Sequence, residues 1–243
     1  MNIQDFIASL TKEDIVYINQ EFEKLQNQIP SYSFSKIKDQ ELKKIVNIKR
    51  RIANNCFDNW FNKPINLPND IIKFLNDLIA ENKDFIKDYN EEDLKINFIA
   101  PILNKIHYKD IENEIRAFYN ESLSYETKEF ILTGNCDFYV SKGLFSPEKP
   151  YFFIQEFKKG IQYSNPEPQL LAELIAAVEL NGFTTMKGAY IVGAIWNFVI
   201  LEKLDKNKYQ YFISDNFDST KIEDLTAIYK NLLFVKDEIM QNH

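Results

Sequence analysis

The sequence predicts an α/β protein with a mixed sheet, in which a helical N-terminal region precedes the sheet-containing part. Three successive segments between residues 114 and 158 are rich in aromatic and β-branched residues and are separated by polar turns. A helical segment follows them, and further strand-like segments come after that helix. This order is typical of a mixed α/β or α+β sheet, and 243 residues suit one sizeable domain with an appendage.

The N-terminal region, residues 1–87, is predicted to be helical. Thr11 begins the first helix with a capping pattern, and apolar residues recur behind it at helical spacing. A second helix is expected from Lys36 to Phe57, and a third begins near Pro68. Residues 88–243 are expected to form the main domain.

The main domain is expected to contain helices and strands whose limits follow from periodicity and from the positions of Pro and Gly. The predicted elements are a helix over 91–106, strands over 114–125, 128–141 and 151–158, a helix over 166–180, strands over 189–194, 196–201 and 209–213, and a helix over 221–240.

The composition limits the classes of function. The net charge of −7 argues against a nucleic-acid partner unless basic residues gather on one face. The two cysteines, Cys56 and Cys136, lie far apart without CxxC spacing, so neither a disulfide framework nor a zinc site is expected. The N-terminus lacks a signal-peptide pattern, and the longest apolar run, 188–201, is too short to span a bilayer. We therefore expect a cytoplasmic protein with no membrane partner.

Charged residues occur where the sequence predicts buried strands. Glu156 and Lys158 share one face of a strand whose other residues are largely apolar on both faces. Charges are rarely buried unless they are paired or bind a metal ion. Asp137 lies on the preceding strand, on the face opposite to Cys136 and Phe138. If the two strands pair as a hairpin, we expect the carboxylates of Asp137 and Glu156 to lie within roughly 6 Å of each other.

Such a constellation has a definite chemistry. Two carboxylates suit Mg²⁺ or Mn²⁺, which binds one or two carboxylates together with water and substrate phosphate. A lysine beside the metal ion can orient or help deprotonate the attacking water and can stabilise the charge that develops on phosphorus. Asp137, Glu156 and Lys158 are therefore the candidate residues for metal-dependent phosphodiester hydrolysis.

The motif has a recognisable form. The pattern Gly134-x-x-Asp137-Phe138, followed by a hydrophobic strand that ends in Glu156-x-Lys158, resembles the PD-(D/E)XK nuclease superfamily over roughly residues 88–202. Cys136 stands where the motif has proline. The resemblance implies a restriction-endonuclease-like core with helices on both faces. It also implies metal binding by Asp137 and Glu156, a catalytic role for Lys158, and hydrolysis of DNA more than of RNA.

Two flanking residues extend this resemblance. Superfamily members commonly carry a glutamine or lysine beside the metal ion in the helix after the strands, and Gln169 is the matching position, four residues before Glu173. The helix before the strands often supplies a further glutamate. Glu91 shares a helical face with Leu94 and Phe98, so we expect it to face the sheet as an additional metal ligand.

A basic surface is expected on the second helix. Its apolar residues form one arc, and Lys43, Lys44, Arg50 and Arg51 form the opposite arc. The guanidinium fork binds phosphate oxygens in a bidentate manner, so these four residues are candidate nucleic-acid contacts.

Other interpretations remain open. Glu156 and Lys158 can be a solvated cross-strand pair, and Asp137 can be a turn residue; a plain scaffold requires exposed charges. The same fold can also serve as a catalytically silent nucleic-acid-binding or protein-interaction module, or can act on a special substrate such as a branched DNA or a tRNA. The N-terminal region can bind a protein partner or a second copy of the chain.

Overall fold

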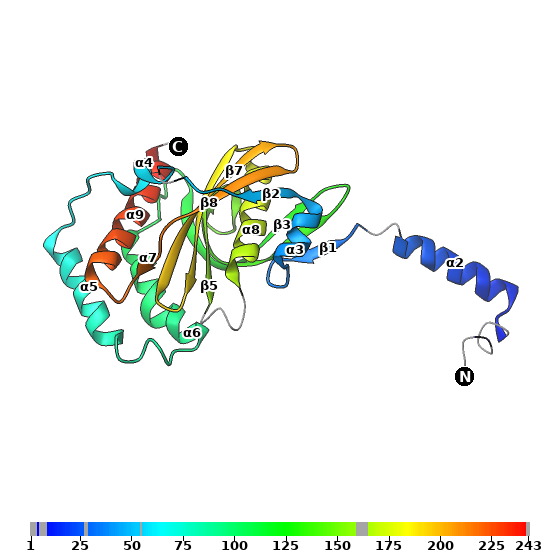
Figure 1. Cartoon of the computed structure of the whole chain (residues 1–243), viewed down its shortest axis with the longest axis horizontal. Helices are drawn as coiled ribbons and strands as arrows, with labels where there is room; N and C mark the ends of the chain where they lie inside the picture. The colour runs from blue at the N-terminus through cyan, green and yellow to red at the C-terminus, as the bar shows by residue number, and fades with distance from the viewer. Residues whose placement is uncertain (1–3, 5–8, 27–28, 54, 159–164, 242–243) are drawn as a thin grey trace.

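The computed structural model describes residues 4, 9–26, 29–53, 55–158 and 165–241 (Figure 1). Its strands are β1 (Ser31–Ser33), β2 (Asn47–Arg50), β3 (Ile115–Glu126), β4 (Ile131–Lys142), β5 (Glu148–Lys158), β6 (Thr185–Val192), β7 (Ile195–Asp205), β8 (Lys208–Ile213) and β9 (Phe217–Asp218). Its helices are α2 (Lys12–Gln26), α3 (Asp39–Ile45), α4 (Asp58–Phe61), α5 (Asn69–Asn82), α6 (Glu91–Leu94), the π-helical turn η1 (Lys95–Ile99), α7 (Ala100–Ile106), α8 (Pro166–Asn181) and α9 (Ile222–Gln241).

The strands form one mixed, curled sheet in the order β1-β4-β5-β6-β7-β8-β2, with β3 added beside β4 and β9 beside β7. β3, β4 and β5 are consecutive antiparallel strands, whereas β5 and β6 run parallel because α8 connects them. The predicted hairpin between the second and third strands of the main domain is confirmed, and so is the mixed α/β class.

Helices cover both faces of the sheet (Figure 1). α3 and α8 pack against one face, where Leu42 and Leu174 are fully buried. α4, α5, the continuous α6–η1–α7 segment and α9 cover the other face, with Trp60, Phe98 and Leu232 in its core. Because both faces are covered, a charged side chain on a central strand is withdrawn from water unless it lies at a strand end.

Helix α8 is anchored closely to the sheet. Asn165 caps it by accepting a hydrogen bond from the Glu167 amide at 3.1 Å, and Gly182 ends it in a left-handed conformation with φ of 71°. Beneath the helix, a Cβ atom at Gly188 would come within 2.9 Å of the Ile154 carbonyl oxygen and 3.0 Å of Leu174. Glycine at this position of β6 therefore permits the close approach of α8.

Residues 31–50 correct the expected all-helical N-terminal region. The helix predicted from Lys36 to Phe57 is wrong, because the chain leaves α3 after Ile45 and continues as β2, which pairs in parallel with β8. Ile48 is buried while its neighbours are exposed, which is the period of a strand, and Ile52 of the predicted apolar arc is 94% exposed. The short strands β1 and β2 thus join the sheet of the main domain.

The first predicted helix is confirmed as α2. The Asp14 amide donates to Thr11 Oγ1 at 3.1 Å, and the Thr11 amide donates to Asp14 Oδ2 at 2.9 Å, which is a reciprocal cap. Figure 1 shows α2 extending away from the sheet, and the apolar side chains of Ile15 and Tyr17 on it are exposed. No helix in the described part of the chain is both long and apolar enough to cross a membrane.

Candidate functional site

The site lies where one edge of β4 changes its pairing partner. β3 occupies the whole of one edge, so β1 and β5 share the other. β1 pairs with residues 131–133, and the pairing with β5 begins at Phe138. Between them, Gly134 has φ of 151°, and a Cβ atom there would come within 3.1 Å of the Phe34 ring. A glycine is therefore required where β1 ends against β4.

Asp137 closes this gap with its side chain. Its Oδ2 atom accepts a hydrogen bond from the Phe157 amide at 2.9 Å, so the carboxylate takes the place of a main-chain acceptor at the end of the β4–β5 ladder. This bond fixes the aspartate beside the last residues of β5. The split edge of β4 thus determines where this carboxylate stands.

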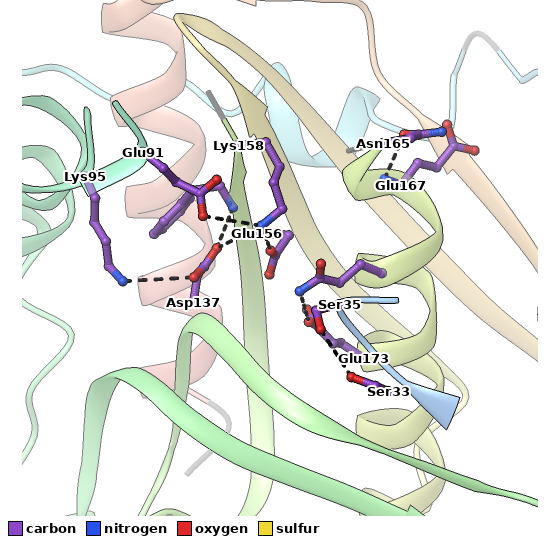
Figure 2. Close-up of polar contacts among 12 residues, drawn as sticks. Ser33, Ser35, Glu91, Lys95, Asp137, Glu156, Lys158, Asn165, Glu167 and Glu173 are labelled. Atoms are coloured by element: carbon purple, nitrogen blue, oxygen red, sulfur yellow. Dashed lines mark hydrogen bonds and ion pairs between the residues drawn. The ribbon is translucent and has the colours of Figure 1, made fainter. Parts of the chain in front are cut away.

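Glu156 and Lys158 complete the centre of the site (Figure 2). The Lys158 Nζ atom donates to Glu156 Oε1 at 2.5 Å and lies 3.9 Å from Asp137 Oδ2. The side chain of Glu156 is only 1% exposed, and that of Lys158 is 14% exposed. The interpretation as a solvated edge pair is therefore wrong, because both charges are withdrawn from water.

Two more charged residues approach from the helical layer. Glu91, the first residue of α6, places Oε1 3.5 Å from Lys158 Nζ, and its side chain remains 46% exposed. Lys95 begins η1, and its Nζ atom lies 3.9 Å from Asp137 Oδ1. Figure 2 shows both side chains directed at the Asp137–Lys158 pair. Sequence reasoning missed Lys95, although its spacing of four residues from Glu91 is a usable signal.

Helix α8 contributes two buried polar residues. Gln169 Nε2 donates to Glu173 Oε1 at 3.1 Å, and the two side chains are 5% and 0% exposed. The charges of Glu156 and Asp137 act on Glu173, so this second carboxyl group belongs to the same cluster. The contact of Gln169 is to Glu173, which sequence reasoning noted only as its helical neighbour, and a role of Gln169 beside a metal ion stays a prediction.

The electrostatics of the cluster are dominated by burial and by excess negative charge. Burial, and then the neighbouring Asp137, raise the pKa of Glu156 well above its usual range, although Lys158 opposes the shift. Burial, and then Glu156, likewise raise the pKa of Glu173. The pKa of the Cys136 thiol is also raised, by burial and then by these carboxylates. A pKa raised in this way indicates a group that lacks enough positive charge around it.

Lys158 responds to the same field in the opposite sense. Burial acts to lower the pKa of its ammonium group, but Glu156, Asp137 and Glu91 outweigh burial and raise that pKa overall. Lys158 therefore remains a cation at neutral pH and supplies positive charge and hydrogen-bond donors at the centre of the cluster.

Several polar atoms of the site lack a partner. Among the described residues, no donor reaches the buried atoms Glu156 Oε2, Glu173 Oε2 and Gln169 Oε1. An unpartnered buried carboxylate oxygen is costly, so Glu156 and Glu173 each have an oxygen that a proton, a cation or a water would stabilise.

A divalent cation fits this donor set. Mg²⁺ and Mn²⁺ bind one or two carboxylates and keep several waters, and the adjacent carboxylates of Asp137 and Glu156 offer such a pair. Within the described ranges, no group of three or more His, Cys, Asp or Glu side chains is arranged to hold a metal ion. Asp137, whose side chain is 21% exposed, and the buried Glu156 are therefore a pair of candidate ligands and not a closed protein cage. The roles of Asp137, Glu156 and Glu91 as ligands stay predictions.

Two details of the sequence interpretation need correction. Cys136 does not share a face with Phe138, because Cys136 packs in the core under α8 and Phe138 in the opposite core. The alternation is interrupted at Asp137, opposite which Asn120 of β3 has φ of 53°. The predicted basic residues also lie on different elements: Lys43 and Lys44 are on α3, where Lys43 pairs with Asp39 at 2.7 Å, and Arg50 ends β2 with Arg51 directly after it.

Comparison with known proteins adds no assignment: no family model and no curated protein matches this chain.

Proposed function

We propose that the protein is a Mg²⁺- or Mn²⁺-dependent nuclease of the PD-(D/E)XK type that hydrolyses phosphodiester bonds, in DNA more than in RNA. The observation that supports this proposal is the buried Glu156 carboxylate, which holds one oxygen against Lys158 and leaves the other without a partner beside Asp137. A structural ion pair has no physical reason to leave that oxygen unpartnered.

The proposed roles follow from position. Asp137 and Glu156 would hold the divalent ion, which when bound would supply polarisation of a phosphoryl oxygen and a lowered pKa of water. Lys158, between the two carboxylates, donates to the phosphoryl oxygens and stabilises the negative charge that grows as water attacks phosphorus. The attacking water gives its proton to solvent as its oxygen bonds to phosphorus, the bond from phosphorus to the leaving oxygen breaks, and that oxygen takes up a proton from solvent. Gln169 and Glu173, hydrogen-bonded to each other on α8, line the side of the site that faces this helix.

The test is metal-dependent cleavage by the full chain. Wild-type protein is expected to cut DNA with Mg²⁺ or Mn²⁺, and Ca²⁺ is expected to support binding with little cleavage. Asp137→Asn and Glu156→Gln each remove a ligand charge while keeping the shape of the side chain, and each is expected to abolish cleavage. Mn²⁺ should also raise the thermal midpoint of wild type, by up to about 2.7 kcal/mol of stability at 100 times its Kd, and this gain should be lost in both variants.

The matched control is Glu238→Gln. Glu238 of α9 pairs at 2.6 Å with Lys187, which lies beside Phe153, five residues from Lys158 along β5. This substitution changes the net charge in the same way as Glu156→Gln. Cleavage by Glu238→Gln should equal that of wild type. Equal cleavage by all variants would identify a contaminating nuclease, and binding of DNA without cleavage under every divalent ion would favour the silent binding module.

A further inference from the structure

A pocket begins one strand away from the candidate site. Lys158 at the end of β5 pairs with Val192 at the end of β6, and Val192 lines a pocket of about 380 Å³ at the start of α8. Several polar residues line the pocket, among them Asn197 and Asn216, and the Asn197 side-chain amide donates to Asn216 Oδ1 at 2.6 Å. The ring of Tyr190 lines the same space. Amide groups and a phenol ring in one pocket suit a nucleobase, which offers both hydrogen-bonding edges and a stacking face.

A second pocket of about 420 Å³ lies next to the first at the strand ends. Asn216 lines the first pocket, and the preceding residues Ser214 and Asp215 line the second, together with Arg50 and Arg51. Phe57 and Phe212 of the second pocket belong to the core opposite α8, so a ligand that occupies both pockets passes around the ends of the strands. The second pocket also contains aromatic rings, namely those of Phe57, Phe61, Phe212 and Phe217.

The two arginines are available for a ligand. Arg50 and Arg51 are exposed, and neither guanidinium group has a hydrogen bond or ion pair with any residue in the described ranges. Arg116, in contrast, donates to the main-chain oxygens of Ala117 and Leu144 and stacks on Phe118. Unpaired arginines at the rim of an aromatic pocket suit phosphate on one side and a base on the other.

Carboxylates that line the two pockets indicate where the bases and where the phosphates of a nucleic acid would lie. Glu167 accepts from Tyr211 Oη at 2.7 Å, and Asp58 accepts from Asn62 at 3.3 Å. Asp58 and Asp215 line the second pocket with the two arginines and are, like them, exposed, so they disfavour phosphate away from the arginines and can accept hydrogen bonds from base amino groups. A phosphate is therefore placed at the arginine side chains themselves.

We propose that a single nucleic-acid strand leaving the Asp137–Lys158 site runs through these two pockets to Arg50 and Arg51, which hold a distant phosphate. This inference rests on the proposed nuclease function and names its substrate as a single strand, because a base paired within a duplex cannot enter a side pocket. From β5 to β2 the sheet makes four strand steps of about 4.8 Å, on the order of 19 Å across the strands. The strand register aligns Arg50 with Met186 of β6, six residues before Val192, the partner of Lys158, which adds roughly 20 Å along the strands. The combined span of roughly 28 Å corresponds to about eight nucleotides at about 3.4 Å per stacked nucleotide.

The test compares strands that do and do not reach the arginines. Binding of labelled single-stranded DNA of about 4 and about 12 nucleotides is measured with Ca²⁺ over a range of salt concentrations, and cleavage is measured with Mn²⁺. Wild type should bind the long strand at least about tenfold more tightly than the short one. The double variant Arg50→Ala/Arg51→Ala should lose this advantage, bind and cut the short strand normally, and show a salt slope smaller by about 1.4, or about 0.7 per lost contact.

The control is Lys206→Ala/Lys208→Ala, which removes the same charge at the exposed β7–β8 turn, where Lys208 pairs with Asn47 at the start of β2. It should keep the full advantage of the long strand. An unchanged advantage in the arginine variant, an equal loss in the control, or a preference for duplex DNA of the same length would overturn the path.

The two proposals fail in different ways. Cleavage with the same length dependence in all three proteins would reject the path and leave the nuclease standing. An arginine-dependent length effect without any cleavage would reject hydrolysis and leave the path standing, whereas no binding of single strands at all would contradict the path outright.

Discussion

Two of the three glutamates on helix α8 have opposite surroundings, Glu173 in its first half and Glu179 near its end. Glu179 accepts from Lys203 Nζ at 2.8 Å through one oxygen and from Tyr209 Oη at 2.5 Å through the other. Glu173 is fully buried, has one oxygen without a partner among the described residues, and faces another carboxylate, Glu156. The same residue type on the same helix therefore serves two different purposes.

The hydrogen bonds of Glu179 stabilise the fold, whereas the buried Glu173 beside Glu156 destabilises it. A satisfied carboxylate at the edge of the sheet contributes to stability, since both of its oxygens exchange water for protein donors. Carboxylates buried beside each other cost free energy and are relieved only by protons or by a bound cation. The cluster of Asp137, Glu156 and Lys158 beside α8 is a candidate site because the fold leaves part of its negative charge uncompensated. Three experiments probe the contrast between Glu173 and Glu179.

The largest expected effect concerns the two lysines of the comparison. Lys158→Ala should lower the cleavage rate by about 100-fold or more, while the affinity for nucleic acid stays close to that of wild type, because Lys158 acts mainly on the transition state. Lys203→Ala removes the partner of Glu179 and should leave the rate unchanged. Single-turnover rates and binding constants measured on the same preparations distinguish the two. Equal losses of cleavage rate in Lys158→Ala and Lys203→Ala would contradict a special role for Lys158.

The next effect is on the free energy of unfolding, and here the residue outside the candidate site, Glu179, is expected to matter more than Glu156. Glu179→Gln should lower the free energy of unfolding by about 1–3 kcal/mol, since an amide oxygen cannot replace both acceptors. Glu156→Gln should leave the free energy of unfolding unchanged or raise it, because it removes one of several mutually repelling carboxylates while an oxygen remains to accept from Lys158. Chemical denaturation in the presence of a chelator measures both. A larger loss for Glu156→Gln would mean that its carboxylate is structural.

The smallest effect is the pH dependence of stability in the metal-free protein. Burial raises the pKa values of Glu156 and Glu173 above their ordinary 4.5, so the folded state holds protons that the unfolded state has released. Stability from these groups is therefore lost as pH rises from 4.5 through the raised values, and it is regained on acidification.

Glu173→Gln removes one of the two titrating groups and should flatten this dependence, by an amount on the order of 1 kcal/mol at neutral pH. Denaturation midpoints between about pH 5 and about pH 8 provide the measurement. Parallel curves for wild type and Glu173→Gln would contradict the raised pKa of Glu173, because they would mean that it is ionised in the folded state throughout that range, as it is in the unfolded state.

Much of the fold could be predicted because its signals are local. The strands β3, β4 and β5 are long and rich in aromatic and β-branched residues, and α8 has prolines at its start and Gly182 after its end. The short strands β1 and β2 were not predicted. They have only three and four residues, which is too few for the alternation of a strand to be distinguished from the helical spacing of the residues before them. Their strand conformation comes from pairing with β4 and β8, which are distant in sequence.

The sequence by itself determined that Glu156 and Lys158 share one strand face amid apolar residues, and that Asp137 lies on the neighbouring strand, because strand period and hairpin order are local properties. Only the tertiary structure decided that β4 divides one edge between β1 and β5, which turns Asp137 onto the Phe157 amide. It also decided that Lys95 and Glu173 reach the same cluster from separate helices. Such contacts join residues far apart in the chain, and their free energy depends on burial and on neighbouring charge, which arise only when the sheet and both helical layers are assembled.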